Sequence, residues 1–217
     1  MTGQSSARPS RRIVIPALGL TQILAWGASY YLLTVLGPPI AAETGWSLTL
    51  IVGGFTLGLL MGGTTSPRVG RLIEVHGGSP ILSASSVFFG CGLILLGLAH
   101  HLPVYLAGWI LIGVGMASGL YGASFATLGR AYGVEARSAI ATLTLIAGFA
   151  STVCWPMAAF LVAHFGWRNT CFAYAALHIL LYVADEKFEQ DMRFLSVATR
   201  GTRKRLAKYI LARLEAD

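Results

Sequence analysis

The residues of this chain that could do chemistry are sparse, and most of them lie between long apolar runs. Between residues 13 and 184 the acidic residues are Glu43, Glu74 and Glu135, and none lies inside an apolar run. General acid–base catalysis and carboxylate proton relays both need such groups positioned inside a site. There is no His-Glu-x-x-His sequence, and the run Gly-Leu-Tyr-Gly-Ala-Ser at 119–124 departs from the Gly-x-Ser-x-Gly pattern. The sequence therefore predicts that the protein is not an enzyme.

The cysteines and paired histidines do not suggest a metal site either. Cys91, Cys154 and Cys171 lie in apolar runs, their number is odd and their spacings are not those of metal ligands, so we interpret them as small buried thiols. His100 and His101 are adjacent, so their side chains point in different directions on any regular element, and we expect a solvated turn. We predict no metal and no cofactor.

The composition is that of a membrane protein. Of the 217 residues 55% are hydrophobic and only 12% are charged, and the mean hydropathy is +0.66. Soluble domains carry about 25% charged residues, which they need to cover their surface. The eight charged residues between positions 13 and 184 all lie near gaps between apolar runs. The runs are therefore expected to be spans of one polytopic domain embedded in a lipid bilayer.

We predict an all-α bundle of six transmembrane helices. A helix needs about 20 apolar residues to cross a bilayer. The predicted spans are 13–42, 48–66, 80–99, 102–128, 138–165 and 170–184. They form a transmembrane domain over residues 13–184, with an N-terminal tail at 1–12 and a polar C-terminal tail at 185–217. Pro38-Pro39 should kink or end the first span, Pro156 should kink the fifth, and Ser47 could cap the second.

The second span contains glycines at a helical repeat. Gly54, Gly58 and Gly62 are spaced by four residues and form one smooth stripe. Small residues at this spacing let helix backbones approach closely in lipid. We expect tight packing against a neighbouring helix.

The distribution of lysine and arginine predicts the orientation. With the N-terminus inside, the inside segments carry 3, 2, 2 and 8 basic residues, and the outside links carry only Arg168. Cytoplasmic loops are enriched in Lys and Arg, so both termini are expected in the cytoplasm. This distribution also accounts for the net charge of +7, and no nucleic acid partner is expected.

The tail at 185–217 differs in kind from the rest. It holds eight of the sixteen basic and six of the nine acidic residues. We interpret it as a solvated tail. Its part 203–214 could also form a basic amphipathic helix attracted to anionic lipid.

The polar link after the second span carries a recognisable pattern. Gly70, Leu72, Glu74 and Gly77 resemble the loop signature of the major facilitator superfamily, Gly-x-Leu-x-Asp-Arg-x-Gly-Arg-Arg. Glu replaces the usual Asp, and the arginine and the basic pair that follow in the family are absent here.

Other runs point the same way and extend the resemblance over residues 13–182. The link before the sixth span resembles the same superfamily, and the first span with the link at its end is similar to bacterial monocarboxylate and oxalate/formate carriers. The residues concerned are Trp26, Gly27, Tyr30, Tyr31, Pro38-Pro39, Gly45-Trp46 and Gly166-Trp167-Arg168.

The resemblance implies half of a carrier. Members of the family are built from two six-helix halves that rock around a central site. The chain would match the first half, in a truncated or half-length form, and would pair with itself or with a separate second half. The implied function is transport of a small organic solute, a carboxylate being one candidate, across a bacterial inner membrane. The alternatives are a non-transporting scaffold or regulator and an inactive remnant.

The resemblance also implies which faces line the cavity, namely those of the first and fourth spans. The candidate cavity residues are Gln22, Trp26, Ser29, Tyr30, Ser118, Tyr121 and Phe125, which share one face on each span. Aromatic and hydroxyl groups can orient a small organic ligand in an apolar cavity. Helix–helix packing is the alternative role for each. The arginine that family members often carry in the fourth span is absent, so neither proton coupling through it nor a buried cation is expected in this half.

The loop acid of the family takes part in a charge cluster that closes the inward side. Glu74 and Arg130 both lie at predicted cytoplasmic ends of spans. We therefore predict that they meet as a gate, the alternative being two independently solvated charges of little energetic value.

Overall fold

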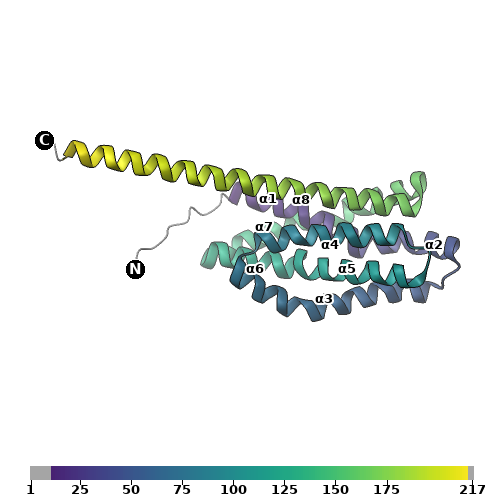
Figure 1. Cartoon of the computed structure of the whole chain (residues 1–217). Helices are drawn as coiled ribbons and strands as arrows, with labels where there is room; N and C mark the ends of the chain where they lie inside the picture. The colour runs from purple at the N-terminus through teal and green to yellow at the C-terminus, as the bar shows by residue number, and fades with distance from the viewer. Residues whose placement is uncertain (1–10, 215–217) are drawn as a thin grey trace. The chain divides into compact units, whose positions relative to one another are not determined.

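The computed structural model describes the backbone of residues 11–214 and the side chains of residues 14–183. The described chain is helical throughout and has no strand, which confirms the all-α prediction. The elements are α1 (Arg11–Trp26), the π-helix η1 (Gly27–Tyr31), α2 (Leu32–Thr44), α3 (Leu48–His76), α4 (Ser79–Gly97), α5 (Leu102–Gly119), α6 (Tyr121–Tyr132), the 3₁₀ turn η2 (Gly133–Glu135), α7 (Ala136–Ala147) and α8 (Ala150–Leu214). Figure 1 shows them in chain order.

The chain divides into two compact units, residues 1–181 and 182–217. The first holds the helical bundle. In the second the backbone is helical as far as Leu214. The side chains on which the predicted basic face at 203–214 depends lie outside the described residues.

Four described stretches are long and apolar enough to cross a membrane. They are Val14–Thr44, Leu48–His76, Ser79–Gly97 and the 82-residue stretch Leu102–Val183. An unbroken helix of 82 residues would measure about 120 Å, against a hydrocarbon core of about 30 Å. The backbone instead changes direction inside this stretch, and it does so at Leu120, Gly133 and Gly166.

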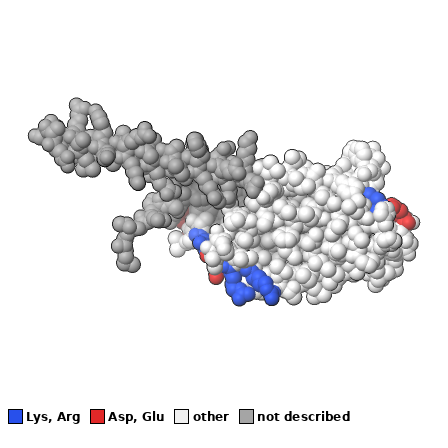
Figure 2. All heavy atoms as spheres, in the orientation of Figure 1, with Lys and Arg blue, Asp and Glu red and all other residues white. Residues whose placement is uncertain are grey.

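The surface agrees with a position in lipid. Figure 2 shows charged atoms gathered at opposite ends of the visible bundle, with a broad uncharged zone between them. Large apolar side chains are exposed among the described residues, including Leu60, Phe149 and Phe160. In water such a surface would drive association, whereas in a bilayer it is solvated by lipid tails.

Glycines hold α3 against α5. A Cβ added to Gly54 would lie 2.5 Å from the ring of Tyr105, and one added to Gly58 would lie 2.9 Å from the carbonyl oxygen of Trp109. A Cβ on Gly113 would overlap the backbone carbonyl of Gly58. The two backbones are therefore in direct contact, and the predicted packing role of the glycine stripe in the second span is confirmed.

The same device joins α4 to α5. A Cβ added to Gly92 would lie 2.8 Å from the carbonyl oxygen of Gly108, and one added to Gly108 would lie 3.0 Å from that of Gly92. At these glycines the backbones of three helices approach closely, and side chains such as Ile112 and Leu96 also pack against them, as small residues permit in membranes.

Of the two outcomes predicted at Pro38-Pro39, a kink or an end of the helix, the end is not observed. The helix neither ends nor breaks at Pro38-Pro39 but continues to Thr44, where Gly45 with a φ of 72° terminates it. Each proline leaves one carbonyl of the preceding turn without its amide partner, a defect that membrane helices tolerate. Ser47 then caps α3 by accepting a hydrogen bond from the amide of Leu50, as predicted.

The second span was also predicted to end too early. α3 does not stop near Ser66 but runs through Pro67 to His76, so most of the polar link is helical. Gly77, with a φ of 90°, ends the helix. Arg68 and Arg71 therefore extend from the last turns of a helix instead of a loop.

The fourth span was predicted without a break and has one, and the break in the fifth span lies at a different place from the predicted one. The predicted continuous helix 102–128 is divided at Leu120, whose ψ of −172° is extended. The fifth span is interrupted between Ala147 and Ala150, upstream of Pro156, which lies inside α8. Gly166, with a φ of 77° and a ψ of 166°, turns the chain before the predicted sixth span.

Candidate functional site

The first and the fourth spans each contain an irregular piece of backbone. η1 interrupts the first span at Gly27–Tyr31, and the extended residue Leu120 separates α5 from α6. The amide of Gln22 donates one hydrogen bond to the carbonyl of Gly119 and another, of 2.9 Å, to the hydroxyl of Ser124. A helix end inside a membrane needs such partners because no water is available to its carbonyls. Gln22 thereby joins the first span to the broken fourth span.

Four of the predicted cavity residues are joined by ring contacts at this point. The ring centroid of Trp26 lies 4.7 Å from that of Tyr30 and 5.2 Å from that of Tyr121. Tyr121 stacks on Phe125 at 5.1 Å. All four residues are partly buried, so none is fully enclosed by the bundle. We call Trp26, Tyr30, Tyr121 and Phe125 the aromatic wall.

A series of further ring contacts connects the aromatic wall to Phe55 of the second span and, through it, to Trp46 just before that span. Tyr30 meets Phe55 edge-on at 5.1 Å, and Phe55 meets Trp109 at 5.3 Å. Trp109 and Tyr105 are in contact at 6.4 Å, and Tyr105 meets Trp46 at 5.6 Å. Phe55 is a member of this series that the motif-based prediction missed. Its signal, one apolar residue among many in a glycine-rich span, is weak.

The two serines among the predicted cavity residues have other partners. Ser29 is fully buried and donates to the carbonyl of Ala25 at 2.6 Å. Ser118 is buried and donates to the carbonyl of Val114 at 2.7 Å. Each hydroxyl thus donates a hydrogen bond to a backbone carbonyl of its own helix, which its position in the sequence does not predict.

Two polar atoms beside the wall have no hydrogen-bond partner among the described residues. They are the side-chain carbonyl Oε1 of Gln22 and the indole Nε1 of Trp26, both buried. Gln22 and Trp26 lie one turn apart on α1. One acceptor and one donor are therefore unsatisfied one turn apart on the same helix. Burying such atoms without a hydrogen bond costs free energy in a low-dielectric interior.

The predicted gate residues meet through the backbone. Arg130 of α6 donates to the carbonyl of Ile73 at 3.2 Å and to the carbonyl of Glu74. These are the last carbonyls of α3, so Arg130 caps the helix that the loop signature occupies. In that signature Gly70 has open space at its Cα, Leu72 is exposed, and Gly77 adopts the positive φ that ends the helix.

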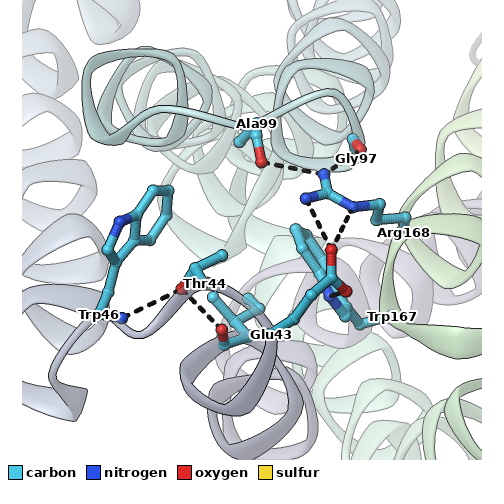
Figure 3. Close-up of polar contacts among 8 residues, drawn as sticks. Glu43, Thr44, Trp46, Gly97, Ala99, Trp167 and Arg168 are labelled. Carbon is cyan, nitrogen blue, oxygen red and sulfur yellow. Dashed lines mark hydrogen bonds and ion pairs between the residues drawn. The ribbon is translucent and has the colours of Figure 1, made fainter.

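A second charged cluster lies at the opposite end of the spans, and Figure 3 shows its geometry. Glu43 accepts a 2.6 Å hydrogen bond from the indole of Trp167 and a 2.9 Å hydrogen bond from Nε of Arg168. The guanidinium of Arg168 also donates to the carbonyls of Gly97 and Ala99, both at 2.9 Å. We call these five residues the outer clasp, because they join the ends of α2 and α4 to the turn in α8.

The sequence prediction did not pair the members of the outer clasp. Glu43 and Arg168 are 125 positions apart, and the sequence analysis placed them in two separate links. A signal was available, since the topology predicted from the charges places both links on the same side of the membrane. Thr44 and Trp46 border the clasp, with the amide of Trp46 donating to the hydroxyl of Thr44 at 3.2 Å (Figure 3).

Comparison with known proteins agrees with this architecture. A family model described as Major Facilitator Superfamily matches residues 18–208. A comparison with curated proteins gave no match. The family match covers the apolar stretches, both irregular backbone segments and both charged clusters. The chain belongs to the Major Facilitator Superfamily.

Proposed function

We propose that the chain forms a six-helix half of an alternating-access carrier and that the aromatic wall lines its path for a small organic solute. Membership of the family implies membrane transport of a solute. The observation that carries the proposal is the aromatic wall, which joins an interrupted first span to a broken fourth span. Carriers of other folds also bind solutes at interrupted helices near the bilayer midplane.

Six crossings with both termini in the cytoplasm fit the two charged clusters. On this topology the contact of Arg130 with α3 lies at the cytoplasmic surface, and the outer clasp lies at the opposite surface. A bacterial inner membrane is the location that the likeness to bacterial carriers suggests. The gate at Glu74 and Arg130 would then consist of the hydrogen bonds from Arg130 to the end of α3, which break when the inward side opens.

The second half of the carrier would come from another copy of this chain or from a separate protein. α3 supports this part of the proposal because its outer face carries a shallow apolar groove. The groove is lined by Leu48, Thr49, Val52, Gly53, Thr56, Leu57 and Leu60. A cavity bounded by α1, α3 and α6 on one side needs helices on the other side to enclose a solute.

A carboxylate is the solute that the likeness to monocarboxylate and oxalate/formate carriers suggests. The aromatic wall itself contains no basic residue. If the solute is a carboxylate, its counter-charge is therefore expected to come from the second half of the carrier.

Uptake into proteoliposomes tests the proposal. Purified protein should give saturable flux of at least one solute from a panel of labelled monocarboxylates and neutral aromatic compounds. Trp26→Ala and Tyr121→Ala should each reduce that flux. Phe160→Ala should not, because Phe160 is exposed and its ring contacts His164 of the same helix instead of the wall. Folded protein whose flux equals that of empty liposomes for the whole panel would contradict a carrier, and light scattering would report whether the chain forms a dimer.

A further inference from the structure

The aromatic wall offers flat, apolar surface and little else. The rings of Trp26, Tyr30, Tyr121 and Phe125 each keep part of their surface accessible, while the two nearby serine hydroxyls are bonded to their own helices. Ring faces bind other planar groups by offset or edge-on stacking. The wall is therefore shaped for a planar organic group.

The two unpartnered atoms add a polar requirement. Oε1 of Gln22 can accept a hydrogen bond and Nε1 of Trp26 can donate one. Both atoms are buried without a partner among the described residues. A group with a donor and an acceptor on one edge, as in a primary amide or a lactam, complements this pair.

Charge decides between ligands of similar shape. No member of the wall, and neither Gln22 nor Ser124, is charged, and the described contacts of Glu43, Arg130 and Arg168 lie at helix ends. A carboxylate would leave water without gaining a cation, which is costly. An organic cation would gain attraction from the ring faces but would meet the indole N–H with the wrong polarity.

We propose that the aromatic wall, together with Gln22, is a subsite for a planar, uncharged group that carries both a hydrogen-bond donor and an acceptor, with an aromatic amide as the model ligand. This inference rests on the proposed function, because it assumes that the wall lines a solute path. It adds which chemical group of the solute this half binds. The unpartnered atoms are shielded in the present conformation, so the proposal requires the ring of Trp26 to turn before a ligand can reach them. The adjacent π-helix provides a locally irregular backbone for that movement.

Three probes of nearly equal shape test the charge preference. Benzamide, benzoate and benzamidinium share a ring and a planar three-atom group but differ in charge. Equilibrium binding of each labelled probe would be measured on the full chain in lipid nanodiscs. We expect saturable binding of benzamide, benzoate weaker by about tenfold or more, and benzamidinium between them. Benzoate that binds as tightly as benzamide, or benzamide that does not saturate, would overturn the proposal.

Trp26→Phe tests the hydrogen bond, because it keeps a ring in the wall and removes the indole N–H. Benzamide should bind about tenfold more weakly, whereas the matched variant Trp155→Phe should leave its affinity unchanged. Circular dichroism and gel filtration would establish that both variants are folded. An unchanged benzamide affinity in Trp26→Phe would refute the donor role.

Flux measurements separate this inference from the carrier proposal. Saturable benzamide binding with no flux of any solute would leave the subsite standing and remove the carrier function. Flux of a monocarboxylate, with no benzamide binding, would support the carrier and sink the subsite.

Discussion

Arg168 is the residue with the largest number of polar partners in the outer clasp. Its guanidinium bonds the carboxylate of Glu43 and two carbonyls at the end of α4, those of Gly97 and Ala99, and it lies 4.2 Å from the ring centre of Trp167. Its side chain is only 22% exposed. Because three separate elements meet on one charge, losing that charge should affect all of them.

Arg168→Met keeps the apolar stem and removes the guanidinium. We expect it to destabilise the bundle by about 2 kcal/mol, since it leaves buried carbonyls and a carboxylate without a donor. Thermal unfolding in detergent measures the change. Arg137→Met, at an exposed position, serves as the control. Equal stabilities of the two variants would contradict the role of the clasp.

Glu43→Gln separates the charge of Glu43 from its hydrogen bonding. Glutamine can still accept a hydrogen bond from Trp167 or Arg168, and the carboxylate of Glu43 is half-exposed, so the loss should be below about 1 kcal/mol. Glu43→Ala should cost more. The order of the two unfolding temperatures tests this prediction, and the reverse order would disprove it.

His178 is a position where a substitution is expected to stabilise the protein. It is 2% exposed and stacks on Phe89 with centroids 4.8 Å apart, and neither ring nitrogen has a partner among the described residues. His178→Leu removes two unsatisfied buried atoms at the cost of one ring contact. We expect a gain of about 1 kcal/mol in unfolding free energy. A clear loss of stability would show that the imidazole has a partner.

At the scale of elements, α3, α4 and α5 share contacts between backbones. Gly113→Ala places a methyl group against the carbonyl of Gly58, so the two helices must separate. We expect a loss of about 1–3 kcal/mol. Gly63→Ala is the matched control, because nothing lies within 4 Å of its added Cβ. Similar unfolding temperatures for the two variants would contradict backbone contact as the basis of this packing.

Regular patterns within one element could be predicted from the sequence. The glycines of the second span repeat every four residues, and a helix turns that repeat into a single stripe, so the packing face followed directly. The capping role of Ser47 is equally local. The candidate cavity residues on the first span shared a face for the same reason.

Features that depend on a neighbouring element could not be predicted in this way. The break at Leu120 is flanked by Gly119 and Gly122, which look like the packing glycines elsewhere, and it is held by Gln22 from another span. The continuation of α3 through Pro67 also went against the local signal. The predicted topology put Glu43 and Arg168 on the same side of the membrane, but only the folded arrangement shows that they are in contact.

At the scale of the whole molecule, the orientation in the membrane is open to a direct test. His101 and Val134 are exposed and lie in links that the charge distribution assigns to opposite surfaces. In His101→Cys and Val134→Cys, an impermeant maleimide should label the first from outside intact cells and the second only in inverted vesicles. The parent chain gives the background from its own cysteines. Labelling of both from one side would refute the proposed topology.

The outer clasp also has a consequence for biosynthesis. Trp167 and Arg168 leave the ribosome more than 120 residues after Glu43, so every span before the turn in α8 must be inserted without them. The clasp is therefore among the last contacts to form, and it can form only when the first span and the turn in α8 reach the same side of the bilayer. If cysteines replaced Glu43 and Arg168, formation of a disulfide between them would report when insertion of these spans is complete.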